Sequence, residues 1–169
     1  MSCNKNKNAF ENMAPLFDFK MTIAQSHERM KKAYICSPCL ARSIDGIYDN
    51  MMAARYYMYY AYTTFGVRPR APHAVLPVVL NDGTQSERDM ALDFGQKLLH
   101  TADEMLVCGH ILSEGMRSEI LTAIELNIPI TVYSLDLFRE IKKLTDSTLI
   151  RLDKNHRPLT LNGNELIKF

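Results

Sequence analysis

The sequence lacks the features that mark several large classes of protein. Its charge is almost balanced, with 20 Lys and Arg against 19 Asp and Glu, and the two signs are interspersed along the chain. A broad basic face for nucleic acid and an electrostatic membrane anchor are therefore not expected. No apolar run approaches the roughly 18 residues of a membrane-spanning helix. The nearest candidate, residues 51–65, is interrupted by Arg55 and rich in tyrosine. We therefore expect neither a nucleic-acid partner nor a membrane partner.

The chain has no tryptophan and only four cysteines among its 169 residues. A chain of this length buries enough surface to form a core without disulfides or a structural metal. The first thirty residues contain charged side chains and no apolar run typical of a secretion signal. We therefore expect a cytoplasmic protein whose cysteines are reduced thiols.

Short apolar runs alternate with longer amphipathic stretches from residue 31 onward. This alternation predicts an α/β domain over residues 31–145 with a doubly wound, flavodoxin-like, mostly parallel sheet. Residues 1–30 are interpreted as an N-terminal extension, and residues 146–169 as a small antiparallel β appendage. The expected strands are 33–36, 67–72, 104–108 and 128–133, the expected helices are 44–65, 86–101, 113–127 and 134–143, and a loop is expected over 73–83.

Residues 36–39 read Cys-Ser-Pro-Cys and lie between an expected strand and an expected helix. In dithiol oxidoreductases such a motif places the first thiol at a helix N-terminus, which lowers its pKa. Here the helix begins several residues later, near Ile44. For a zinc site, the motif supplies two ligands, and Cys108 with His110 is the only other pair of Cys and His residues at short spacing in the sequence. A buried strand cysteine followed by a loop cysteine is the simpler interpretation, so we expect no metal site, and a redox function stays an alternative.

A second motif follows the third expected strand, where Ser113, Gly115 and Glu119 open the next helix. Gly115 permits close backbone approach, and the free N–H groups of a first helical turn can bind an anion or a sugar hydroxyl. In an open parallel sheet, ligands bind beyond the carboxyl ends of the strands, where neighbouring crossovers diverge. With the common strand order 2-1-3-4, that point lies between the strands ending near Ser37 and Gly109. Both motifs should then line one crevice, although the helix dipole alone also favours a glutamate near a helix start.

Several short motifs, taken in order and spacing, resemble the nucleoside 2-deoxyribosyltransferase superfamily. The branch that they most resemble is a bacterial and phage group with the pattern SPY…APH…DE…SxGM…E. The residues that carry the resemblance are 34–38 (YICSP), 65–66 (FG), 71–73 (APH), 102–104 (ADE), Ser113, Gly115, Met116, Glu119, Ala123 and 128–129 (IP). The resemblance implies a flavodoxin-like fold and chemistry at the N-glycosidic bond of nucleosides or nucleotides.

The resemblance also implies roles for two residues of the second motif. Glu119 matches the family's nucleophilic carboxylate, which stabilises an oxocarbenium-like sugar and can trap it at C1′. Ser113 stands where the transferases have an aspartate, and where the related 2-deoxynucleoside 5-monophosphate N-glycosidases have a serine that contacts the phosphate. This match implies a nucleoside monophosphate as substrate, favours hydrolysis over transfer, and requires no cofactor.

Other contacts are implied by looser matches. An acid on the helix before the third strand is expected at the base or the leaving group. The spacing does not decide which aspartate this is. Asp93 is a candidate for a catalytic residue, and Asp89 is a candidate for a substrate contact. The remaining substrate-binding candidates are Ser37, Arg42, His73, Gly109, Ser113, Gly115 and Met116. Arg42 could equally be a solvated loop residue. His73 could equally have a structural role.

The expected function is therefore cleavage, by hydrolysis or transfer, of the N-glycosidic bond of (deoxy)nucleoside 5-monophosphates. A non-catalytic nucleotide-binding or sensing protein that uses the same crevice is the alternative. The Tyr- and Met-rich helix over 44–65 predicts a homo-oligomer, most simply a dimer, because these residue types are favoured at interfaces. The resemblance points the same way, because relatives complete their sites with residues from a neighbouring subunit.

Overall fold

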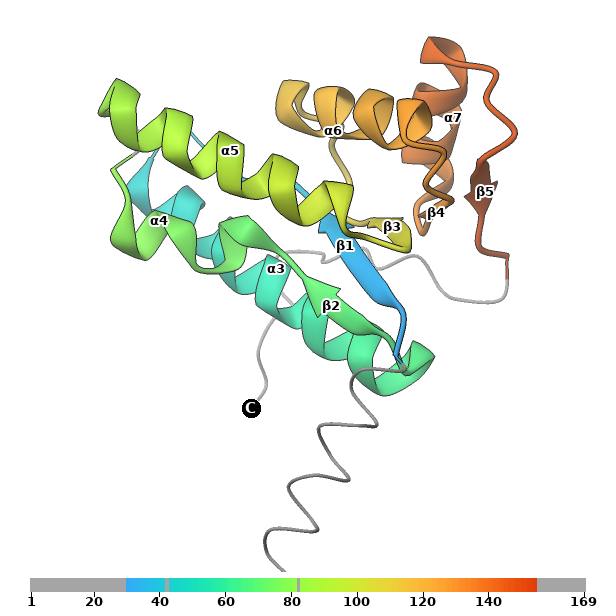
Figure 1. Ribbon diagram of the computed structural model, residues 1–169, viewed down its shortest axis with the longest axis horizontal. Helices are drawn as coiled ribbons and strands as arrows, with labels where there is room; N and C mark the ends of the chain where they lie inside the picture. The colour runs from blue at the N-terminus through green and yellow to red at the C-terminus, as the bar shows by residue number, and fades with distance from the viewer. Residues whose placement is uncertain (1–29, 42, 82, 155–169) are drawn as a thin grey trace, which may run out of the picture. The chain divides into compact units, whose positions relative to one another are not determined.

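The computed structural model describes residues 30–41, 43–81 and 83–154 (Figure 1). Nearly all of the predicted N-terminal extension over 1–30, and the second half of the predicted appendage over 146–169, lie outside these residues. The domain boundaries predicted near residues 30 and 146 therefore stay predictions.

The described residues form an α/β fold around one five-stranded sheet, and every neighbouring pair of strands is parallel. The strand order is β2-β1-β3-β4-β5. The strands are β1 Lys32–Cys36, β2 Arg68–Arg70, β3 Glu104–Val107, β4 Ile130–Val132 and β5 Ile150–Leu152. The helices are α3 Ile44–Phe65, the 3-10 turn η1 Pro72–Ala74, α4 Leu76–Val79, α5 Gln85–His100, α6 Glu114–Glu125 and α7 Leu135–Leu144. The predicted α/β class with a parallel sheet is thus confirmed.

Alternating side chains along the strands build one core on each face of the sheet. In β1, Tyr34 and Cys36 belong to one core cluster, and Ala33 and Ile35 belong to the other. All four side chains are buried, as expected of a parallel strand covered on both faces. Helices α5, α6 and α7 contribute to the core that contains Tyr34, whereas α3 contributes to the opposite core.

The connections diverge between β1 and β3. The chain leaves β1 towards β2 through α3, and it leaves β3 towards β4 through α6, which is the opposite direction across the sheet. Because such crossovers are right-handed, the two helices lie on opposite faces and open a crevice beyond the carboxyl ends of β1 and β3. The sequence predicted this divergence at the same pair of strands.

Local sequence signals explain the limits of α3, which begins and ends where it was predicted. The Ser43 hydroxyl accepts a hydrogen bond from the Gly46 N–H at 3.1 Å, as an N-cap does. The helix ends at Gly66, whose φ of 62° lies in the left-handed region that glycine adopts without steric cost. One serine and one glycine therefore set the two ends of this 22-residue helix.

The C-terminal part of the described chain differs from the prediction. β5 lies beside β4 in parallel register, with Ile150 opposite Ile130, instead of starting an antiparallel appendage. The physical reason is that α7 is a crossover helix, which returns the chain to the same end of the sheet. The other strand expected in the appendage, residues 158–161, lies outside the described residues. No helix in the described part of the chain is both long and apolar enough to cross a membrane.

Candidate active site

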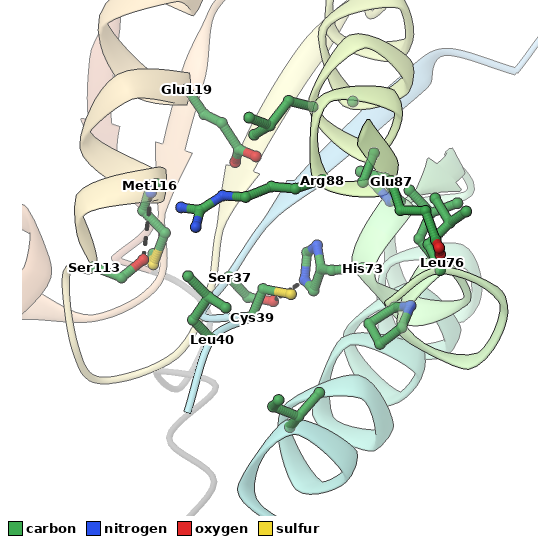
Figure 2. A pocket seen from close by; sticks show the side chains of 18 of the residues that line it. Ser37, Cys39, Leu40, His73, Leu76, Glu87, Arg88, Ser113, Met116 and Glu119 are labelled. Carbon is green, nitrogen blue, oxygen red and sulfur yellow. Dashed lines mark hydrogen bonds between the residues drawn. The ribbon is translucent and has the colours of Figure 1, made fainter. Parts of the chain in front are cut away.

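A pocket of about 990 Å³ opens at the divergence of the crossovers (Figure 2). Its walls come from the loop after β1, the start of α3, the η1–α4 segment, one face of α5 and the first turns of α6. The polar or charged lining residues include Tyr34, Ser37, His73, Arg88, Gln96, Ser113, Ser118 and Glu119. The two motifs that the sequence analysis singled out therefore line the same pocket.

Glu119 occupies the α6 wall of this pocket. The Tyr34 hydroxyl donates a hydrogen bond of 2.8 Å to Glu119 Oε1. Tyr34 lies in the middle of β1 and is only 1% exposed, so its phenol is fixed by the core while its hydroxyl reaches the carboxylate. Figure 2 shows the Glu119 carboxylate pointing into the open space of the pocket. The carboxylate is therefore hydrogen-bonded to β1, and it faces the open space of the pocket.

The surroundings of Glu119 also set its protonation. Burial raises the pKa of its carboxyl group, and the hydrogen bonds from Tyr34 and Cys36 act in the opposite direction because they stabilise the ionised form. Burial, together with the charge of Glu119, raises the pKa of Tyr34, so this phenol stays a proton donor in its hydrogen bond. The site thus holds a carboxylate whose ionised form depends on two donors from β1.

The cysteines do not have the character of a dithiol redox centre. Cys36 is fully buried, and burial beside Glu119 raises the pKa of its thiol well above the usual value. A redox-active thiol needs the opposite shift. Cys36 and Cys108 are both buried free thiols. The geometry therefore disfavours the oxidoreductase alternative.

Ser37 and His73 form a buried pair on the floor of the pocket. Ser37 Oγ lies 2.7 Å from His73 Nε2, at hydrogen-bond distance. Burial lowers the pKa of His73 to about 4, so the imidazole is neutral at neutral pH. Arg55 supports this segment, because its Nε donates a hydrogen bond of 2.8 Å to the Ala74 carbonyl. The pair offers a substrate two neutral polar groups at fixed positions.

The first turn of α6 forms the wall next to Glu119. Ser113 is the N-cap, and its hydroxyl accepts a hydrogen bond from the Met116 N–H at 3.3 Å. Gly115 leaves open space where a side chain would stand, since a Cβ there would meet nothing within 4 Å. The N–H groups of a first turn have no acceptor within the helix, so they are available to a ligand. Ser113, Gly115 and Met116 therefore all line the pocket, as expected.

Neither acid predicted on α5 lines the pocket. Asp93 forms an exposed ion pair with Lys97 at 2.6 Å, and Asp89 accepts a hydrogen bond from Gln85 at 2.8 Å. The face of α5 that meets the pocket is formed by Glu87, Arg88, Ala91, Leu92, Gly95, Gln96 and Leu99. At about 100° per residue, Asp89 falls just beyond the edge of this face, next to Gln96, and Asp93 falls farther round the helix. The charged α5 residues in this lining are Glu87 and Arg88 instead.

Gly109, a further candidate, does not line the pocket. Gly109 has a φ of 100°, and a Cβ there would come within 3.0 Å of Pro38 Cδ. It allows the end of β3 to pass close to the loop after β1, which is a packing role. Arg42 lies outside the described residues.

Sequence reasoning missed Tyr34 and Arg88 as site residues. Tyr34 belongs to a motif of the resemblance, and its place on the same strand face as Cys36 is the signal that directs its hydroxyl towards α6. Arg88 shares a helical stripe with Leu92, Gly95 and Leu99, and this stripe is the signal that turns it towards the pocket. Among the residues that the structure describes, no group of three or more His, Cys, Asp or Glu side chains could hold a metal ion.

Comparisons with known proteins match the chain to a family model and to solved structures. The family model described as "Domain of unknown function (DUF7768)" matches residues 31–133. The structure of a 2-deoxyribosyltransferase from the psychrotolerant bacterium Bacillus psychrosaccharolyticus is similar, with 14% identity and a TM-score of 0.47 over 60% of this chain and 70% of that chain. No curated protein matches the chain. A likeness of this degree leaves the reaction to be argued from the side chains of the pocket.

Proposed function

This chain belongs to the family described as Domain of unknown function (DUF7768), and we propose that it cleaves the N-glycosidic bond of nucleotides. The proposed substrates are (deoxy)nucleoside 5′-monophosphates, and the sugar passes to water or to a second base. The observation that carries the proposal is Glu119, a carboxylate that accepts a hydrogen bond from Tyr34 and lines a pocket of about 990 Å³. The sequence motifs around Glu119 support the same chemistry.

The proposed reaction has two steps at C1′ of the sugar. Glu119 Oε attacks C1′, forming an ester bond, while the C1′–N bond breaks and the base leaves with its electron pair. Water then attacks C1′ and releases Glu119 as a carboxylate. Over both steps one water is consumed, with its hydroxyl bound to C1′ and its proton on the base. The negative charge of Glu119 stabilises the oxocarbenium-like transition state of each step.

The other pocket residues are assigned supporting roles. Tyr34 holds the carboxylate in place and favours its ionised form through the hydrogen bond. Ser113 and the first turn of α6 are assigned to the 5′-phosphate, since these N–H groups suit an anion. Ser37 and the neutral His73 are assigned to hydroxyl or base contacts.

The test is release of free base from a panel of nucleosides and their 5′-monophosphates, separated by chromatography. We expect release from monophosphates, and a second base added in excess distinguishes transfer from hydrolysis, because transfer makes a new nucleotide. Binding of monophosphates without any base release contradicts the enzyme proposal.

One observation favours the alternative, a nucleotide-binding or sensing protein. Neither Asp89 nor Asp93, the acids that the resemblance offers beside the base, lines the pocket, and the α5 acid that does, Glu87, accepts a hydrogen bond from the Asn81 N–H. In that case Glu119 would bind a sugar hydroxyl without attacking C1′. The same panel distinguishes the two functions, since a sensor binds its ligand and returns it unchanged.

A further inference from the structure

The charges around the pocket are unequal. Among the described lining residues, the acidic side chains are Glu87, Glu114 and Glu119, and Arg88 is the one Lys or Arg. An anionic substrate would meet repulsion from these carboxylates without a cation beside them. Beside the N–H groups of the first turn of α6, Arg88 therefore supplies the full positive charge that favours an anion in this pocket.

Arg88 is not engaged by the acids near it. The Glu87 carboxylate accepts a hydrogen bond from the Asn81 N–H at 2.7 Å, and Glu114 lies 3.9 Å from Arg117. Glu119 is bonded to Tyr34 instead. Within the part of the chain that the structure describes, Arg88 forms no hydrogen bond or ion pair. The guanidinium group thus has its donors free.

The position of Arg88 in α5 is also unfavourable for the helix itself. It is the fourth residue of a helix that begins at Gln85, and a cation near a helix N-terminus is repelled by the positive end of the dipole. Figure 2 shows its side chain extending from α5 across the pocket, with the guanidinium between Glu119 and Ser113. Helix stability does not account for this placement, and the exposed guanidinium is available to a ligand in the pocket.

We infer that Arg88 binds the anionic group of the substrate and thereby selects nucleoside 5′-monophosphates over free nucleosides. The inference rests on the proposed function, because it concerns the ligand of the same site. A guanidinium presents paired N–H donors that match two phosphate oxygens, and its charge offsets the repulsion between the phosphate and Glu119. Arg88, on this view, determines specificity and takes no part in bond breaking.

The experiment compares ligand binding by the full chain and three variants. Isothermal titration is carried out with the four common 2′-deoxynucleoside 5′-monophosphates and the four matching nucleosides. Arg88→Gln should weaken monophosphate binding about tenfold to hundredfold and leave nucleoside binding unchanged. Arg88→Lys, which keeps the charge but loses the paired donors, should fall between. Lys97→Gln is the matched control on the other face of α5, where Lys97 pairs with Asp93, and it should change neither affinity.

Two results would overturn the inference, and they differ in their consequence for the proposed function. If monophosphates bind and Arg88→Gln weakens neither ligand, or weakens both equally, Arg88 does not select the phosphate, while the proposed function survives. If no nucleoside or monophosphate binds the unaltered protein, the proposed function fails and this inference fails with it. Thermal unfolding should show no loss of stability in Arg88→Gln, since the exposed side chain forms no internal bond.

Discussion

At the scale of single residues, Glu119 is the side chain on which the proposed chemistry depends. Glu119→Gln keeps the shape and hydrogen-bonding capacity but removes the charge that stabilises the oxocarbenium-like transition state. Turnover should fall by several orders of magnitude, about 4 kcal/mol or more, while nucleotide affinity changes little. Base release measured by chromatography gives the first quantity, and titration gives the second. The exposed Glu125→Gln on the same helix is the control and should keep full activity. Equal activity of both variants would remove Glu119 from the mechanism.

The hydrogen bond from Tyr34 predicts a pH dependence with a defined sign. Glu119 must be ionised to attack, and burial raises its pKa above 4.5, so activity should rise with pH through that raised value. The Tyr34 hydroxyl lowers the Glu119 pKa, and Tyr34→Phe removes this effect. The acid limb of the kcat/KM profile should therefore move to higher pH in Tyr34→Phe. A limb that stays in place, or moves to lower pH, would show that this bond does not tune the carboxylate.

At the scale of helices and strands, the sequence predicted most of the described elements because their signals are local. The helix over 44–65 is bounded by Ser43 and Gly66, and both cap it. The segment 73–83 was predicted as a loop, yet it contains α4 and the last two residues of η1, because helices this short give no periodic signal. β5 was assigned to an appendage and not to the main sheet, since the crossover before a strand, and not its own residues, places it beside its neighbour.

The candidate site was predictable to the extent that it follows from strand ends and helix starts. Ser37 and Ser113 lie where β1 and β3 end, so the divergence of the crossovers brings them to one pocket. The α5 wall was not predictable in this way, because a resemblance without a fixed alignment does not set the rotation of a helix. A change of one position exchanges Asp89 for Arg88, and with it the sign of the charge in the pocket.

The N-caps of α6 and α7 provide a matched pair of variants. Ser113 and Ser134 each accept a hydrogen bond from the N–H three residues later, but only Ser113 lines the pocket. Ser113→Ala and Ser134→Ala should each lower the free energy of unfolding by about 1 kcal/mol through loss of the cap. Ser113→Ala alone should also weaken monophosphate binding by roughly 1 to 2 kcal/mol and leave nucleosides almost unaffected. Urea unfolding and titration measure the two effects. Equal binding by both variants would assign Ser113 to capping only.

At the scale of the whole molecule, the strand order distributes the helices unevenly. The core on one face of the sheet receives side chains from α5, α6 and α7, whereas α3 is the helix that covers the other face in the described residues. The inner side of α3 is buried through Ala54, Tyr57 and Ala61. Its outer side carries the exposed tyrosines Tyr48, Tyr56, Tyr59 and Tyr62. A helix that is apolar or aromatic on its outer side is typical of an interface.

This surface leads to the prediction of a homodimer that packs through α3. Tyr59 is 68% exposed, and tyrosines gathered on one helix lose unfavourable contact with water when a second copy covers them. Light scattering at micromolar concentration should give twice the 19.3 kDa mass of one chain. Tyr59→Glu should shift the mass to that of a monomer, because a dimer would bury the introduced charge. Leu121→Glu, at an exposed position on α6, is the control and should remain dimeric, since it lies on a helix of the other face. A protein that has the monomer mass before any substitution contradicts the prediction. A dimer that both variants leave intact would place the interface away from α3.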